Sequence, residues 1–345
     1  MLKSLSLSFA LLLFAAATGY PQWNSSRPDG YGPTGVSLDH THETGELMLS
    51  YHYMYMKQNG LRDGTTNIKF GEAIDPRGGG FLTTPTDLSI RTHMFGVSFA
   101  PISRLTIVGT LPVRQASMDN FTRNGRRFTT ESSGLGDVTV AGLWLLDPVG
   151  DQRAHISMEV GLPTGSIARR DVTPLSAGRE FTLPYPMQTS GGTVDLSPGL
   201  TLLGQVADVW SWGGQAQAQF RLGKNDYYSL GDNYTATAWG ARRLNDWLSG
   251  SFRLDWFQWG AIEGADPSQN PLATPASDPN LQGGSRWSAG LGINTYFSEG
   301  SLKGFRVSGE WMVPLYQDLD GPQLETDWII IIGAEYDGVS KLLKR

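Results

Sequence analysis

Apolar and polar residues alternate with a period of two over most of the chain, most clearly in residues 210–222. The even positions from 212 onward are mostly apolar (Trp212, Ala216, Ala218, Phe220 and Leu222), and the odd positions carry Gln215, Gln217, Gln219 and Arg221. Only a β-strand presents alternate residues on two different faces. In a soluble sandwich the apolar face would meet a second sheet, whereas in a membrane barrel it would meet lipid and the glutamines would face water.

The same alternation predicts about twelve strands along the chain. They span residues 46–56, 88–100, 105–114, 137–146, 154–162, 193–204, 210–222, 234–241, 248–259, 287–297, 305–315 and 328–336. In the first of them, Leu and Tyr alternate with Met, Ser and His, which suits a wall between lipid and a lumen.

The connections between these strands alternate in length. Those at 101–104, 147–151, 206–209, 244–247 and 298–303 are short, and those at 59–86, 117–133, 164–191, 223–232 and 261–284 are mostly long and rich in Gly, Pro, Asn or Asp. Short turns on one rim and long loops on the other are typical of bacterial outer-membrane barrels, and a soluble sandwich or jelly roll imposes no such alternation. The sequence therefore predicts an all-β fold, a transmembrane antiparallel up-and-down β-barrel of about twelve strands.

Composition agrees with a barrel wall. The 345 residues include 11 Trp, 12 Tyr, 14 Phe and 43 Gly, and only 17% are charged. Lys3 is followed by a short apolar run and small residues, which predicts a secretory signal peptide over residues 1–19. The absence of periodicity in residues 20–44 predicts a periplasmic leader, either ordered by its contacts or mobile.

The remaining boundaries and several exclusions follow. We expect the barrel over residues 45–337 and a short periplasmic tail over 338–345.

The chain has no cysteine, which excludes disulfides, thiolate metal sites and a cysteine nucleophile. Its net charge of −6 comes with acids and bases interspersed, so nucleic acid is not expected as a partner. The glycines at 134–136 and 161–165 lack the Lys and the helix of a phosphate loop and are expected at strand ends.

The water-facing positions predict the lumen. The residues expected to line the translocation path are Met48, His52, Met54, Met56, Arg114, Glu159, Gln217, Arg221, Arg253, Asp255, Glu310, Ile329 and Ile331. The lumen-facing charges have both signs, and we interpret most of them as cross-strand pairs that stiffen the wall. The alternative is weak charge selection in a narrow passage, but no ring of one sign is visible in the sequence.

An apolar patch is expected where the barrel closes, because a closed barrel pairs its first strand with its last. On the inward face of the first strand lie Met54 and Met56, and on that of the last lie Ile329 and Ile331. A water-filled lumen needs no such patch. We interpret it as a track for an apolar solute, or as the seat of a loop or leader that plugs the barrel.

Two clusters resemble chemical sites. His155 and Ser157 have the spacing of a catalytic pair in outer-membrane lipid hydrolases, but they share a face with Glu159 and are predicted to face the lumen, away from lipid substrate. His40 and His42, with their neighbouring carboxylates and the Met residues of the first strand, have the donor types for copper or zinc. We interpret them as part of a polar leader, and neither a metal nor another cofactor is expected.

Five stretches carry a family resemblance. They are 48–56 (MLSYHYMYM), 59–64 (NGLRDG), 133–137 (SGLGD), 161–165 (GLPTG) and 314–323 (PLYQDLDGPQ). Together they resemble the outer-membrane transporter-like proteins grouped with the meta-pathway of phenol degradation. This resemblance implies a monomeric β-barrel that passes small, often aromatic or apolar, molecules across the outer membrane.

The sequence thus predicts a passive channel or transporter for small molecules, without catalysis, in the outer membrane of a Gram-negative bacterium. Its expected partners are outer-membrane lipids, a small-molecule solute and the barrel assembly machinery, and the chain is expected to act as a monomer. The alternatives are a plugged structural barrel and a barrel lipid hydrolase.

Overall fold

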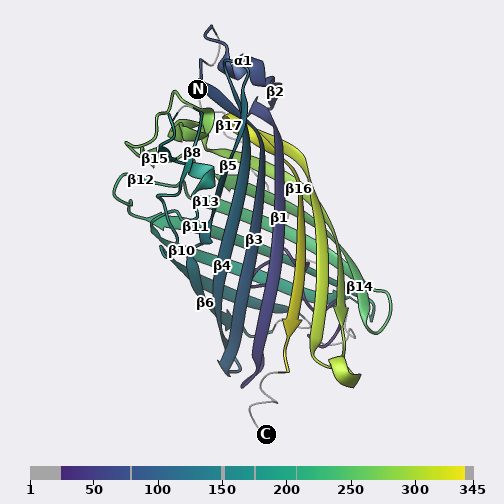
Figure 1. Cartoon of the computed structure of the whole chain (residues 1–345). Coiled ribbons are helices and arrows are strands. Elements are labelled where there is room, and N and C mark those ends of the chain that lie inside the picture. Colours follow the sequence, from purple (N-terminus) through teal and green to yellow (C-terminus); the bar gives the residue numbers. More distant parts are fainter. Residues whose placement is uncertain (1–24, 78–79, 149–151, 175, 207, 339–345) are drawn as a thin grey trace, which may run out of the picture.

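The computed structural model describes residues 25–77, 80–148, 152–174, 176–206 and 208–338, whose long strands form one closed barrel (Figure 1). The barrel strands are β1 (Leu47–Gly64), β3 (Thr83–Ile102), β4 (Leu105–Thr122), β5 (Arg127–Leu135), β6 (Val138–Leu145), β7 (Arg153–Leu162), β10 (Val194–Val206), β11 (Trp210–Leu222), β13 (Asn233–Arg243), β14 (Leu248–Trp259), β16 (Gly284–Tyr296) and β17 (Phe305–Tyr336). Each pairs antiparallel with its neighbours, and β17 closes the ring on β1.

The strand β17 crosses the barrel twice. Its residues 306–319 pair with β16, and its residues 319–336 pair with β1. Between these halves the chain turns back at Gly321 and Pro322, and Gln317 bonds across to the backbone of Thr326. A ring in which every pairing is antiparallel needs an even number of passes. The described barrel therefore has twelve passes, and the predicted all-β antiparallel barrel is confirmed.

Two predicted connections are partly strand: within 59–86, β1 continues to Gly64 and β3 begins at Thr83, and 117–133 differs more. Residues 117–133, expected to be mostly loop, extend β4 to Thr122 and return as β5. Beyond the lipid-facing part of the strand, the outward residues Gln115 and Asp119 are polar, so the pattern that marks a membrane strand is lost although pairing continues. The strands β5 and β6 form one pass that is interrupted at residues 136–137.

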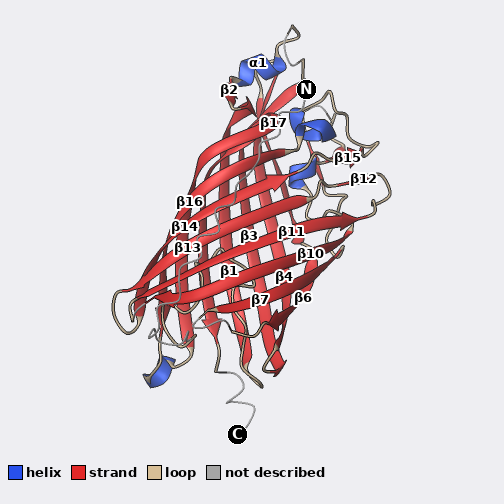
Figure 2. Cartoon of the chain, turned by 180° about the vertical axis from the view of Figure 1, so that it is seen from behind, coloured by secondary structure: helices blue, strands red, loops and turns tan. Residues whose placement is uncertain are grey.

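The barrel has two different ends. At the end where β17 finishes, which we call the turn end, the connections are short apart from one with the 3-10 helix η4 (Gly300–Leu302) (Figure 2). The other end, the loop end, carries the remaining small elements: β2 (Thr66–Ile68), α1 (Phe70–Ile74), β8 (Arg170–Val172), β9 (Glu180–Thr182), η1 (Tyr185–Met187), β12 (Tyr228–Ser229), β15 (Glu263–Gly264), η2 (Pro275–Ser277) and η3 (Pro279–Leu281).

The two faces of the wall differ as the alternation predicts. Large apolar side chains are exposed on the outside of successive strands, among them Phe95, Val97, Phe99, Ile107, Val140, Trp144, Ile156, Leu200, Phe252, Leu254, Leu291, Ile293, Val307 and Trp311. The inward face buries polar side chains such as Arg253, Asp255, Arg286, Arg306 and Glu310. Lipid outside and hydrogen-bonded polar groups inside account for both patterns. Among the described residues, no helix is long and apolar enough to cross a bilayer.

Candidate functional site

The closure seam carries the predicted apolar strip. Met54 lies opposite Ile331, and Met56 lies opposite Ile329. All four side chains pack with Met312 in one cluster on the inside of the wall. The sequence therefore located this strip correctly, because the pairing of first and last strands fixes which residues meet there.

The predicted lumen polars lie on the inward face, mostly with partners. Arg253 donates from Nε to Glu310 Oε1 at 2.8 Å and lies 3.6 Å from Asp255. Arg221 pairs with Asp195 on the neighbouring strand. The remaining predicted residues are placed as follows: Glu159 accepts from the Thr139 hydroxyl at 3.0 Å, His52 lies 3.3 Å from Glu335, Met48 is buried, and Gln217 shares the inward face of β11 with Gln215.

The described part of the predicted leader, residues 25–44, packs inside the turn-end half of the barrel. Arg306, at the start of β17, donates to the backbone carbonyls of Ser25, Arg27 and Pro28. Further along the leader, the backbone N–H of Gly35 donates to Glu310 Oε2 at 2.9 Å. These contacts come from deep inside the wall, so the leader is ordered by contact rather than extended away from the barrel.

Other strands hold the leader from the opposite side of the lumen. The Leu38 carbonyl lies 2.8 Å from Nε2 of His155 on β7, and Gln215 donates to the Ser37 carbonyl at 2.8 Å. The Thr106 hydroxyl then accepts from the backbone N–H of His42 at 2.9 Å. Because these bonds satisfy several of the leader's backbone groups, an irregular segment can remain in the lumen.

The leader carries two largely buried pairs of ionisable side chains, Arg27 with Asp29 and His40 with Asp39. His40 Nδ1 lies 2.7 Å from Asp39 Oδ1, and the imidazole stacks on the ring of Tyr31 at 3.6 Å between centroids. Burial alone would lower the pKa of His40, but the Asp39 carboxylate outweighs it and raises this pKa. Burial likewise acts to raise the pKa of Asp39, and its interactions with His40 and the Gly32 N–H outweigh it and lower this pKa.

The spacing of His40 and His42 does not build a metal site here. Their rings meet edge to face with centroids 4.9 Å apart, and His42 lies 3.5 Å from Glu46 instead of sharing a centre with Asp39. Among the described residues, no group of three or more His, Asp or Glu side chains is arranged to hold a metal ion.

His155 and Ser157 face the lumen. Their side chains are buried inside the wall, while Ile156 and Met158 are exposed on the outside. The His155 ring is hydrogen-bonded to the backbone of the leader. The Ser157 hydroxyl lies beside Gly199 on the neighbouring strand β10. This geometry gives the pair no access to lipid.

A cavity of about 370 Å³ lies between the leader and the wall from β1 to β7, and we call it the leader cavity. Its lining includes Met54 and Ile331 of the seam. Its acidic side chains are Asp39, Asp137, Glu159 and Glu335. Asp137 accepts from the Ser190 hydroxyl at 2.9 Å and from the N–H groups of Gly165 and Gly191. Each of these carboxylates therefore has a hydrogen-bond or ion-pair partner close at hand.

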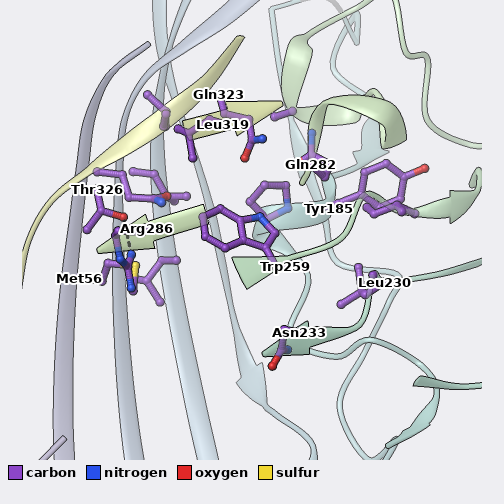
Figure 3. Close-up of a pocket in the computed structure, with 18 of the residues that line it drawn as sticks. Met56, Tyr185, Leu230, Asn233, Trp259, Gln282, Arg286, Leu319, Gln323 and Thr326 are labelled. Carbon is purple, nitrogen blue, oxygen red and sulfur yellow. Dashed lines mark hydrogen bonds between the residues drawn. The ribbon is translucent and has the colours of Figure 1, made fainter. Parts of the chain in front are cut away.

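A second cavity, of about 360 Å³, lies under the loops, and we call it the loop-end cavity (Figure 3). Trp259 projects into its centre, with Arg286, Met56 and Thr326 on one side and Tyr185 and Leu230 on the other. Loops 163–193 and 260–283 contribute to its lining through Tyr185, Pro186, Ile262, Ala276 and Gln282. The loops thus narrow the mouth of the barrel.

One apolar cluster fixes the loops over this cavity. It joins wall residues to the loop before β3 and to the two long loops, and its members are Leu61, Ala73, Leu88, Ala116, Met118, Leu183, Met187, Ala276 and Leu324. Nearby, Tyr185 and Tyr228 meet edge to face at 4.9 Å, and burial raises the pKa of both hydroxyls. The loops over the loop-end cavity are therefore held by packing as well as by hydrogen bonds.

One of the solved structures similar to this chain shares its architecture. An outer membrane channel from Pseudomonas putida F1 superposes with a TM-score of 0.58 over 87% of this chain and 98% of the channel, at 10% sequence identity. The transport unit of the autotransporter AIDA-I from Escherichia coli gives a TM-score of 0.48 over 87% of this chain and 92% of that one, also at 10% identity. No protein-family model and no curated protein sequence matches the chain. This chain has the fold of an outer-membrane barrel.

Sequence reasoning identified only some of the residues that line the loop-end cavity of this outer-membrane barrel. Arg114 and Arg221 were predicted to face the lumen, but Arg286 and Trp259 were not singled out, although both lie on the inward parity of their strands. Tyr185, Ile262 and Gln282 lie in loops without periodicity, so no local signal indicated them. The described lining of the loop-end cavity has three arginines and no carboxylate, a local excess of one sign that the sequence did not indicate.

Proposed function

We propose that the protein is an outer-membrane channel that passes small, partly apolar or aromatic molecules by passive diffusion. The observation that carries this proposal is that the linings of the two cavities adjoin along the inner wall. On β1, Met56 lines the loop-end cavity and Met54, the next residue on the same face, lines the leader cavity. On β4, Arg114 and Pro112 are divided in the same way.

The distances involved suit a short step between cavities. Residues two apart on a strand are separated by roughly 6.6 Å, about the size of one aromatic ring. The seam strip of Met54, Met56, Ile329 and Ile331 lies beside this step. Flexible thioethers adapt to solutes of different shape, so this strip offers an apolar surface where one cavity gives way to the other.

The setting of the channel follows from the same features. The exposed apolar face supports contact with the lipids of a Gram-negative outer membrane, and a closed wall without free strand edges suits a monomer inserted by the barrel assembly machinery. The resemblance to the proteins grouped with the meta-pathway of phenol degradation remains a prediction from the sequence. It agrees with aromatic solutes. No catalytic step is part of the proposal.

A plugged structural barrel is the second candidate, because the leader occupies the turn-end half of the lumen. The arginine contacts at Arg306 and the bond from Gly35 to Glu310 favour a leader that stays in place. Under this alternative the leader cavity is a closed void and no solute crosses.

Flux measurements separate the two candidates. The purified full-length protein, first checked for heat-modifiable gel mobility, is reconstituted into liposomes, and entry of benzyl alcohol, benzamide and sucrose is compared with that in empty liposomes. We expect the two aromatic solutes to enter and sucrose to be excluded. Entry no faster than in empty liposomes for all three solutes would support the plugged barrel. A protein that stayed soluble without detergent would contradict both.

A further inference from the structure

The loop-end cavity carries positive charge that the protein neutralises only in part, since Arg221 is paired with Asp195 while Arg114 has no carboxylate partner among the described residues. Its three charged lining residues are Arg114, Arg221 and Arg286, and no Asp or Glu belongs to the described lining. They come from β4, β11 and β16, which lie three to five strand passes apart around the ring. Three guanidinium groups therefore approach one cavity from separate sides of the wall.

Arg114 has no carboxylate partner among the described residues. Two of its three guanidinium nitrogens donate to backbone carbonyls of the long loop, Nη2 to Pro186 at 2.7 Å and Nη1 to Gln188 at 2.6 Å. Carbonyl dipoles orient a guanidinium but leave its net charge in place. The group is only partly covered, and it lines the cavity.

Arg286 is also incompletely paired. It donates to the Thr326 hydroxyl at 2.8 Å, and its guanidinium carbon lies 5.8 Å from the centre of the Phe257 ring. The carboxylate whose charge acts most strongly on it is Asp255, which already lies beside Arg253. Its buried Nε has no hydrogen-bond partner in the described structure, and the same is true of Nε of Arg221. Buried donors without acceptors are costly, so an acceptor supplied by a ligand would be favourable.

Most of the remaining lining is apolar or aromatic, and its uncharged polar side chains are Gln58, Asn233, Gln282, Gln317, Gln323 and Thr326. The rings of Trp259 and Phe257 stack with centroids 5.1 Å apart. The apolar side chains of Leu88, Met118 and Leu319 line the same cavity as the arginines. A volume of about 360 Å³ is at the small end of ligand pockets, which fits a molecule of roughly one or two rings.

From this combination we propose that the loop-end cavity is a binding site for small aromatic or branched aliphatic carboxylates. A planar carboxylate matches the two-pronged donors of a guanidinium, and its apolar body suits Trp259 and Phe257. Strongly hydrated phosphates suit this lining less well, because they would lose water against apolar walls. This inference rests on the proposed channel function, since it names the solute class of the same passage.

The decisive measurement compares two probes that differ in charge. Binding of benzoate and of neutral benzamide to the full-length protein in detergent is measured by calorimetry. We expect benzoate to bind at least about tenfold more tightly, the typical gain from a hydrogen bond to a charged group. Arg114→Gln and Arg286→Gln should each weaken benzoate binding by roughly tenfold and leave benzamide binding unchanged.

Three controls keep the result interpretable. Arg77→Gln removes the same charge from a loop-end side chain that is 92% exposed, and it should leave both affinities unchanged. Arg286→Lys keeps the charge but loses the planar fork, so it should recover part of the benzoate affinity. Heat-modifiable mobility of every variant excludes a folding defect.

Binding and flux fail separately. Equal affinity for benzoate and benzamide, no detectable binding of either, or equal losses of both in the arginine variants would overturn the carboxylate site, even if both probes enter liposomes. Selective benzoate binding without entry of either probe would leave the carboxylate site intact and overturn the proposed channel.

Discussion

The two halves of the lumen handle charge in opposite ways. In the turn-end half, acids and bases are paired with each other or with the leader, as in His40 with Asp39 and Arg253 with Glu310. In the loop-end half, Arg114 and Arg286 face a cavity whose described lining contains no carboxylate. Buried charges are retained where a partner stabilises them. In the turn-end half the partners include the protein's own leader; at the loop end Arg221 has Asp195, and the proposed carboxylate ligand would supply a partner for Arg114 and Arg286.

The two halves of the lumen also differ in the interactions that hold the segments inside them. The leader is held mainly by hydrogen bonds from the wall to its backbone, such as those from Arg306 and Gln215. The loops over the other cavity are held by an apolar cluster that includes Leu88, Met118 and Met187. When a hydrogen-bonded segment leaves the wall of a water-filled lumen, water replaces its hydrogen bonds at a small net cost. Water cannot replace the apolar contacts that hold the loops over the loop-end cavity. Changes at the turn end are therefore expected to alter passage most.

Deleting residues 25–43 should have the largest effect. The leader packs inside the turn-end half of a twelve-pass barrel and leaves only the leader cavity beside it. Its removal would leave a wider water-filled lumen at that end. We expect the single-channel conductance in planar bilayers to rise several-fold while the roofed loop end still limits it. An unchanged conductance in a correctly folded deletion would contradict the view that the leader narrows the lumen.

Gly35→Leu should have a smaller effect of the same kind. A Cβ atom at this position would lie 2.5 Å from Nη2 of Arg253 and 2.6 Å from the Ile331 methyl, so either these side-chain ends or the leader around Gly35 must move. We expect a conductance between those of the intact and the deleted protein.

Changing both Met54 and Ile331 to Asn tests the seam that joins the halves. The two residues are paired across the closure and line the leader cavity. Replacing them should slow liposome entry of benzyl alcohol several-fold and leave small polar solutes unchanged or faster, since the apolar surface is lost. Thr110→Asn, on the same cavity wall, should change neither rate. Equal effects on both solute classes would remove the seam from the path.

Ser157→Ala should have the smallest effect. Because Ser157 is 6% exposed and lies inside the wall, membrane lipid composition in cells that overproduce the protein should not change. A lipase or deacylase activity that disappears with this substitution would show that the strand face had been misassigned.

The sequence predicted the wall better than its contents. Every predicted strand is present, and Met54 meets Ile331 as expected, because period-two alternation and barrel closure are local and geometric constraints. The extension of β4 through Met118 and Thr122 was missed, since its outward residues are polar once lipid ends. The positions of Tyr185 and Ile262 depend on loops that pack across the barrel, and no periodicity encodes such contacts.

The passage beside the leader can be tested by fixing the leader in place. The hydroxyls of Thr34 and Ser308 are in contact, and the chain contains no cysteine, so Thr34→Cys with Ser308→Cys permits one specific disulfide between leader and wall. The measurement is entry of benzyl alcohol into liposomes that contain the oxidised double variant, before and after reduction. If solute passes from the loop-end cavity to the leader cavity beside a resident leader, entry exceeds that of empty liposomes and reduction does not change it. Entry that stops on oxidation and returns on reduction would contradict this path and show that the leader must leave the lumen.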